Sequence, residues 1–88
     1  MSDTAAVEAR LLEFLSTERF SAGRDITAET DLVASGFDSL AMVSLLMFVE
    51  KSFSLWIPQS ELTGENLQNP HTLAAMVVRL RHNPPPVT

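Results

Sequence analysis

The chain has 88 residues, no cysteine and a formal net charge of −5, which bounds it to one small domain and excludes disulfide bonds and thiol catalysis by its own side chains. Its six lysine and arginine residues are scattered, whereas binding to a phosphate backbone needs them clustered, so we expect no nucleic-acid partner. No apolar run approaches the ~20 residues that cross a bilayer, and the polar first residues are unlike a signal peptide, so we expect a cytoplasmic protein that does not insert into membranes.

Residues 4 to about 19 predict one amphipathic helix. Their apolar side chains recur at the spacing of one helical face, namely Val7, Leu11, Phe14 and Leu15. Residues 20–37 then contain two glycines and several Ser, Thr and Asp residues without a sustained period. This pattern predicts a long loop, and ordered loops of this length are often functional. The side chains expected to hold that loop against the core are Phe20, Ile26, Leu32, Val33 and Phe37.

A second helix is predicted from residue 38 or 39 to about residue 53. Every residue from Leu40 to Val49 is apolar except Ser44, although a helix on the surface of a small domain needs only one apolar face. We expect one stripe of this helix to face the other helices, formed by Leu45, Val49 and Phe53 with the neighbours Met42 and Leu46.

The other apolar residues of this helix, Leu40, Val43 and Met47, should meet solvent, because a three- or four-helix domain of this size cannot surround one helix completely. An exposed apolar stripe usually marks a binding surface, and methionine suits surfaces that must adapt to several partners. With Glu50 close behind, these residues form a candidate docking face for partner proteins. The alternative is that the same three side chains belong to the core.

The C-terminal part predicts two more helical segments. "QSELTGENL" can hold one short helical turn ended by Gly64, and Asn69 is expected to cap a last helix that starts at Pro70 and extends to residue 82. No segment predicts a strand. The fold class is therefore all-α: a four-helix bundle of three main helices plus one short helix, with the long loop between helices one and two. The folded domain is expected over residues 1–82, followed by a disordered Pro-rich tail over residues 83–88.

Two further groups of side chains bear on function. His71 and His82 are not spaced as metal ligands with any other residue, so we expect no metal site and place both on the surface. Large aromatic side chains are expected to crowd the core, with Trp56 inside it or at its rim, and a crowded core resists the insertion of a long chain. The aromatic residues in question are Phe14, Phe20, Phe37, Phe48, Phe53 and Trp56.

The pair Asp38-Ser39 stands at the start of the second helix. A helix N-terminus carries unpaired N–H groups and a partial positive charge, which favours a phosphate attached there. Asp38 is expected to cap this helix. No histidine or other base is close to Ser39 in the sequence, which fits an acceptor of a chemical group better than a nucleophilic catalyst. We therefore expect no catalytic residue in the chain.

The stretch "DLVASGFDSLAMVSLLMFVEKSFSLWIP", residues 31–58, resembles the acyl carrier protein family, whose members are also called phosphopantetheine-attachment domains. The core of the resemblance is a Gly-x-Asp-Ser-Leu pattern formed by Gly36, Asp38, Ser39 and Leu40. It extends to the upstream pair Asp31-Leu32 and, downstream, to Phe53 and Ile57-Pro58. The order helix, long loop, helix, short helix, helix matches the family over residues from about 4 to 82.

In that family the serine equivalent to Ser39 carries 4′-phosphopantetheine as a phosphodiester, and the thiol at the end of this arm holds an acyl or aminoacyl group as a thioester. The resemblance therefore implies a discrete, monomeric, non-catalytic carrier. A phosphopantetheinyl transferase would attach the arm from coenzyme A, an acyl- or amino-acid-activating ligase would load it, and a downstream transferase or synthase would take the cargo. Asp38 would also help present Ser39 to the transferase, and Gly36 would permit a backbone angle closed to other residues. The alternative is a small helical protein-interaction module without a prosthetic group.

The cargo is open between fatty acid, polyketide and nonribosomal peptide chemistry. Fatty-acid carriers usually place several acidic residues along the helix after the serine, whereas this helix has only Glu50. The segment "IPQSELTGENLQNPHTLAAMV" more closely resembles carriers of D-alanine or other aminoacyl groups and carriers of specialised metabolism. The shared run is Glu65, Asn66, Leu67 and Pro70. We therefore expect a short or aminoacyl cargo on an exposed arm and, from Met1 and the short polar tail, a free-standing protein.

Overall fold

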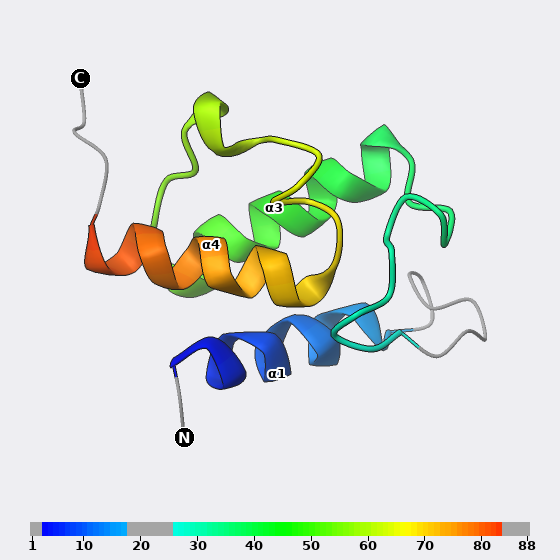
Figure 1. The fold of residues 1–88 in the computed structure, drawn as a ribbon, viewed down its shortest axis with the longest axis horizontal. Helices are drawn as coiled ribbons and strands as arrows, with labels where there is room; N and C mark the ends of the chain where they lie inside the picture. The colour runs from blue at the N-terminus through cyan, green and yellow to red at the C-terminus, as the bar shows by residue number, and fades with distance from the viewer. Residues whose placement is uncertain (1–2, 18–25, 84–88) are drawn as a thin grey trace.

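The structure is a computed structural model that describes residues 3–17 and 26–83. Its elements are α1 (Asp3–Leu15), α3 (Ser39–Phe53), the single 3₁₀ turn η1 (Gln59–Glu61) and α4 (Pro70–His82) (Figure 1). Across these two ranges every regular element is helical and no residue is in a strand. The all-α prediction of three main helices and one short one is confirmed.

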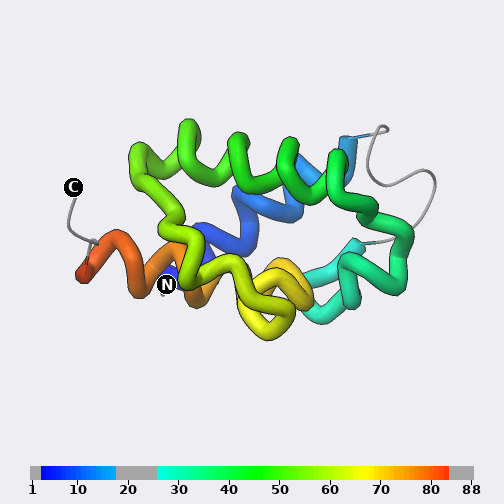
Figure 2. Tube along the Cα trace, turned by 90° about the horizontal axis from the view of Figure 1, so that it is seen from above, coloured from blue at the N-terminus to red at the C-terminus, as the bar shows by residue number. Residues whose placement is uncertain are grey.

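Two helices that are far apart in the sequence form the base of the bundle. α1 packs against α4, and the two lie side by side in the ribbon view (Figure 1). α3 covers one side of this pair, and the segment that contains η1 connects α3 to α4 (Figure 2). None of the helices in the described ranges is long and apolar enough to cross a membrane.

α1 is shorter than the sequence predicts, because it ends at Leu15 rather than near residue 19. The Ser16 hydroxyl donates a hydrogen bond to the carbonyl oxygen of Glu13 at 2.7 Å. Side-chain hydrogen bonds of this kind offer the backbone an alternative to continuing the helix. The end of the predicted helix and Phe20 lie outside the described residues.

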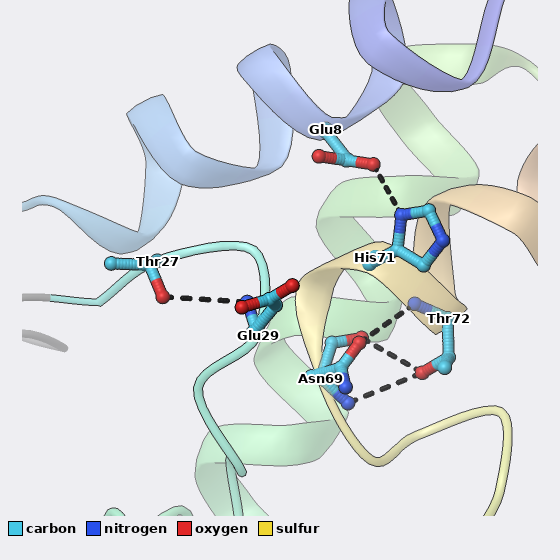
Figure 3. Close-up of polar contacts among 6 residues, drawn as sticks. All are labelled: Glu8, Thr27, Glu29, Asn69, His71 and Thr72. Atoms are coloured by element: carbon cyan, nitrogen blue, oxygen red, sulfur yellow. Dashed lines mark hydrogen bonds and ion pairs between the residues drawn. The ribbon is translucent and has the colours of Figure 1, made fainter.

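α4 begins as the sequence predicts, with Asn69 as its cap and Pro70 as its first residue. The Asn69 side chain accepts a hydrogen bond from the Thr72 N–H at 2.8 Å, and the Thr72 hydroxyl accepts one from the Asn69 N–H at 3.2 Å (Figure 3). This reciprocal capping box satisfies two backbone donors that the helix leaves unpaired. It fixes the point at which the chain enters α4.

The buried core is aliphatic. All the leucine, isoleucine, valine and methionine side chains in it come from the three helices, from Leu32 and from Ile57. They are Val7, Leu11, Leu15, Leu32, Leu45, Val49, Ile57, Leu73, Met76, Val77 and Leu80. The stripe that α3 was predicted to turn inward is in place, since Leu45 and Val49 are buried and the other three side chains pack against the core.

Phe37 lies in the core as predicted, whereas the prediction is wrong for Phe14, Phe48 and Phe53; Trp56, expected inside the core or at its rim, does not lie inside it. Phe37 is buried, but Phe14, Phe48 and Phe53 are only partly buried, and Trp56 is 55% exposed. The rings of Phe14 and Phe48 stack on each other with centroids 4.0 Å apart. Large rings therefore form the rim of the bundle, where they can pair with one another, while branched aliphatic side chains fill the narrow space between the helices.

Three apolar residues hold the described part of the loop before α3 to the bundle. Leu32 and Phe37 are buried and Ile26 is partly buried, as expected, but Val33 is 68% exposed. The Leu32 N–H donates to the carbonyl oxygen of Gln68 at 2.8 Å, which directs Leu32 inward and leaves its neighbour Val33 on the outside. The expectation that Val33 belongs to the core is therefore wrong.

Polar contacts join α4 to α1. His71 Nδ1 lies 2.5 Å from Glu8 Oε2 (Figure 3), and His82 Nε2 lies 3.0 Å from Asp3 Oδ2. Both histidine side chains are exposed, as predicted. Within the described ranges no three His, Cys, Asp or Glu side chains are grouped so that they could hold a metal ion.

Candidate functional site

Ser39 is the first residue of α3, and its side chain is exposed. Asp38 caps the helix: its Oδ1 accepts a hydrogen bond from the Ala41 N–H at 2.9 Å, and its carbonyl oxygen accepts one from the Met42 N–H at 3.0 Å. The predicted capping role of Asp38 is confirmed. Ser39 thus presents its hydroxyl at a helix N-terminus, where unpaired N–H groups and the helix dipole favour an attached phosphate.

A tight turn directly before α3 brings Ser39 to the surface. The N–H groups of Gly36 and Phe37 donate to the carbonyl oxygens of Val33 and Leu32, both at 3.0 Å. Gly36 has a φ of 103°, in the region that side-chain-bearing residues rarely adopt. This bears out the expected backbone angle at Gly36. The turn returns Phe37 to the core and releases the next residues to solvent.

The three apolar residues of α3 that the sequence places at the surface are exposed. Leu40, Val43 and Met47 are 73%, 50% and 60% exposed. The alternative that these side chains belong to the core is therefore excluded. Together they form an apolar stripe that starts beside Ser39 and continues along the helix.

Glu50 differs in kind from the other predicted docking residues. Its side chain is half-buried, and its Oε2 accepts a hydrogen bond from the Ile57 N–H at 3.0 Å. The carboxylate thus holds the chain that leaves α3. The sequence offers one signal for this contact, the single acid of the helix, which lies seven residues before Ile57. The contact itself depends on how the chain turns back after Phe53.

A groove lies beside Ser39, between the loop before α3, the first turns of α3 and the turn after η1. Its volume is about 550 Å³. The residues that line it are Val33, Phe37, Asp38, Ser39, Met42, Val43, Gly64 and Leu67. Sequence reasoning missed Val33, Gly64 and Leu67, because no periodicity connects them and only the folded chain brings them together.

No basic side chain and no histidine is among the groove's lining residues. His71 instead borders a separate cleft between α1 and α4, together with Glu8 and residues 27–29 (Figure 3). The Ser39 hydroxyl therefore has an open approach and no histidine beside it in the groove, and the one carboxylate of the lining, Asp38, is engaged in capping α3 through the Ala41 N–H. This geometry suits a serine that accepts a group from another enzyme rather than one that attacks a substrate.

A small helical domain with an exposed serine at a capped helix start, beside an apolar groove, defines a carrier domain rather than an enzyme. The family model for the phosphopantetheine attachment site matches residues 9–77, which is most of the chain and includes Ser39. The chain belongs to this family, and 4′-phosphopantetheine is the family's prosthetic group. When bound, that group supplies a terminal thiol that holds the cargo as a thioester.

The chain is similar to a named aminoacyl carrier and to a biosynthesis protein. It is 43% identical over 61 residues to aminoacyl carrier protein 1 of Bradyrhizobium diazoefficiens, a match that covers 69% of this chain and 68% of that protein. It is 38% identical over 65 residues to the lincomycin biosynthesis protein LmbN of Streptomyces lincolnensis, where the match covers 73% of this chain and 23% of that protein.

A solved structure has the same fold. It is the complex of the Bradyrhizobium japonicum glycine:[carrier protein] ligase with glycylated carrier protein, which matches with a TM-score of 0.67 and 33% identity over 85% of this chain and 99% of that one. The family, the helical carrier fold, the absence of catalysis and the prosthetic group are therefore as the sequence predicted. The interaction module without a prosthetic group is not supported.

Proposed function

We propose that Ser39 Oγ is the attachment point of the 4′-phosphopantetheine arm and that the arm carries an aminoacyl group. The observation that carries this proposal is the exposed hydroxyl of Ser39 at the capped start of α3. In the attachment reaction, Ser39 Oγ forms a bond to the phosphorus of coenzyme A that bears the pantetheine. Adenosine 3′,5′-bisphosphate leaves, and the hydroxyl proton goes to a base of the phosphopantetheinyl transferase.

The residues around Ser39 have separate roles in this proposal. Gly36 supplies the positive φ that turns the chain, and Asp38 fixes the first turn of α3 by accepting the Ala41 N–H. Leu40 is exposed directly after the serine and offers apolar contact to the transferase. The helix N-terminus stabilises the phosphodiester once it has formed.

An aminoacyl cargo is supported by two observations of different kinds. The similar carriers are named for aminoacyl groups, and the similar solved carrier is glycylated and bound to a glycine ligase. Independently, the described core is aliphatic except for Phe37, and Leu45, Val49 and Val77 are fully buried in it. An amino-acid-activating ligase loads this carrier, and a downstream transferase or synthase removes the cargo.

Partner enzymes dock on the exposed stripe of α3, formed by Leu40, Val43 and Met47. Each of these apolar side chains is at least half exposed. Exposed apolar patches mark protein interaction sites. Glu50, which the sequence placed in this face, is less available to a partner because its carboxylate is half-buried and accepts the Ile57 N–H. Docking therefore depends on apolar contact more than on ion pairs.

The proposal also includes the bounds of the carrier domain, its oligomeric state and its location. We propose a carrier domain over residues 1–82 followed by a tail over residues 83–88, and the start of α1 at Asp3 and the end of α4 at His82 support these bounds. The domain works as a monomer in the cytoplasm.

Intact mass spectrometry tests the attachment. The wild-type chain is incubated with coenzyme A and a broad-range phosphopantetheinyl transferase, and we expect the mass to rise by one arm. Ser39→Ala should show no gain. Ser52→Ala is the matched control, because Ser52 is also exposed on α3 but should leave the gain intact. An unchanged mass of folded wild-type protein would refute the proposal, as would a gain in Ser39→Ala. The aminoacyl cargo is then tested by presenting the arm with its free thiol to an amino-acid-activating ligase and measuring the further gain in mass.

A further inference from the structure

The groove beside Ser39 has the size of a ligand site. Its volume of about 550 Å³ falls within the range of roughly 300–1,000 Å³ that is typical of small-molecule sites. Val33, Met42, Val43 and Leu67 give it apolar walls, while Asp38 and Ser39 are its polar lining residues. A group attached to the Ser39 hydroxyl would lie directly next to these apolar side chains.

Gly64 is a glycine without a structural reason for being one. A Cβ built on its backbone would find no heavy atom within 4 Å. Its φ is not positive, since among the described glycines only Gly36 has that conformation. Neither backbone strain nor crowding therefore requires glycine at position 64. Gly64 is exposed and lines the groove, so a larger side chain at this position would stand in open space beside it.

We propose that the groove holds the part of the phosphopantetheine arm nearest to Ser39, and that Gly64 leaves room for it. This inference rests on the proposed attachment at Ser39. The arm carries two methyl groups close to its phosphate, and the apolar side chains of Val33, Val43 and Leu67 suit them. The tether keeps the arm at a high effective concentration, so that weak contacts are enough to populate the bound position.

The cargo lies outside the groove in this arrangement, because it is bound at the opposite end of the arm from the phosphate. Attaching the arm should therefore change the groove's surroundings, and adding a short cargo should change them little more. Gly64 acts as a residue that positions the arm. It keeps the arm's first part on the carrier while the thioester stays available to a partner.

Two-dimensional NMR of the chain before and after attachment tests this placement. In wild-type protein we expect amide shift changes not only at Ser39 and its neighbours but also at Val33, Gly64 and Leu67. Loading glycine onto the arm should add little at those three positions. In Gly64→Leu, which fills the groove, the changes at Val33 and Leu67 should be mostly lost. In Gly64→Ala they should fall between those of the wild type and of Gly64→Leu.

Glu65→Leu is the matched control, because Glu65 is exposed and adjacent in the chain but does not line the groove. This variant should keep the wild-type pattern. The intact mass of each sample distinguishes a failure of the attachment at Ser39 from a failure of the placement of the arm in the groove. A missing mass gain would overturn both the attachment at Ser39 and the groove. A normal mass gain with shift changes confined to the first turn of α3, or with changes at Val33 and Leu67 that persist in Gly64→Leu, would overturn the groove alone.

Discussion

Gly36 and Gly64 both lie near the candidate site, but only Gly36 has a backbone conformation that requires glycine. Gly36 adopts a φ of 103°, and a residue with a side chain held in such a region costs about 1–3 kcal/mol. Gly64 has an open surrounding and no positive φ, so alanine there should leave stability unchanged or raise it by about 0.4–1 kcal/mol through the unfolded chain. We expect Gly36→Ala to be destabilising and Gly64→Ala not to be.

Urea unfolding followed by circular dichroism measures the difference. The midpoint should fall for Gly36→Ala and stay or rise for Gly64→Ala, with the same slope in both variants. Equal midpoints for the two variants would show that the turn before α3 relaxes at no cost, and that Gly36 is not what releases Ser39 to the surface.

At this same scale the sequence predicts some site residues and not others. Asp38 and Ser39 are predictable because a cap and the residue after it depend on local backbone geometry alone. Val33 was placed in the core because apolarity was the only signal, whereas its direction is set by a hydrogen bond from Leu32 to Gln68. The contact of Glu50 with Ile57 likewise depends on the path of the chain after the helix.

A charged side chain introduced into α3 should have different effects on its buried and its exposed face. Val43 and Met47 are exposed, while Leu45 between them is buried. We expect Val43→Asp and Met47→Glu to leave the fold nearly intact while weakening loading by the partner ligase. Leu45→Asp should unfold the domain, because it places an unpaired carboxylate in the core. Circular dichroism reports the fold, and the rate of cargo loading reports docking.

If either surface substitution unfolded the protein as thoroughly as Leu45→Asp, the stripe would be structural. If both folded and loaded at the wild-type rate, the docking face would lie on another element. Raising the salt concentration should have only a modest effect on loading. The stripe itself is apolar, and the nearby carboxylate of Glu50 is half-buried.

The exposed face of α3 was predictable from the small size of the domain rather than from a sequence motif. A helix with apolar residues on nearly all sides cannot be covered by two neighbours, so part of it must meet solvent. The sequence could not show in the same way that the aromatic rings stay at the rim. Hydrophobicity scales place Phe14, Phe48 and Trp56 inside, but the space between closely packed helices admits aliphatic side chains more readily.

For the molecule as a whole, the closed core bears on the cargo. The side chains of Leu45, Val49 and Val77 are fully buried, and inserting extra methylene groups into a packed core typically costs about 1–3 kcal/mol. We expect that loading the arm with a long acyl chain leaves the amide shifts of these three residues nearly unchanged. NMR spectra of the carrier with a glycyl and with a long acyl cargo measure this.

Large shifts at those residues that grow with chain length would show that the bundle opens to shelter the chain. They would favour a fatty-acyl cargo over an aminoacyl one. Met76 is the residue to examine in that event, because it is buried and methionine repacks more easily than branched side chains.

The position of Glu50 has a consequence for how pathways stay separate in one cell. An enzyme that recognises its carrier through a row of acidic side chains finds no such row here, because the single acid of α3 is engaged with the backbone of Ile57. Specificity is a difference of affinities, and a missing charge pair counts against the wrong partner as surely as a clash does. We therefore expect enzymes that select acidic carriers to bind this one poorly, without any contact devoted to rejecting it.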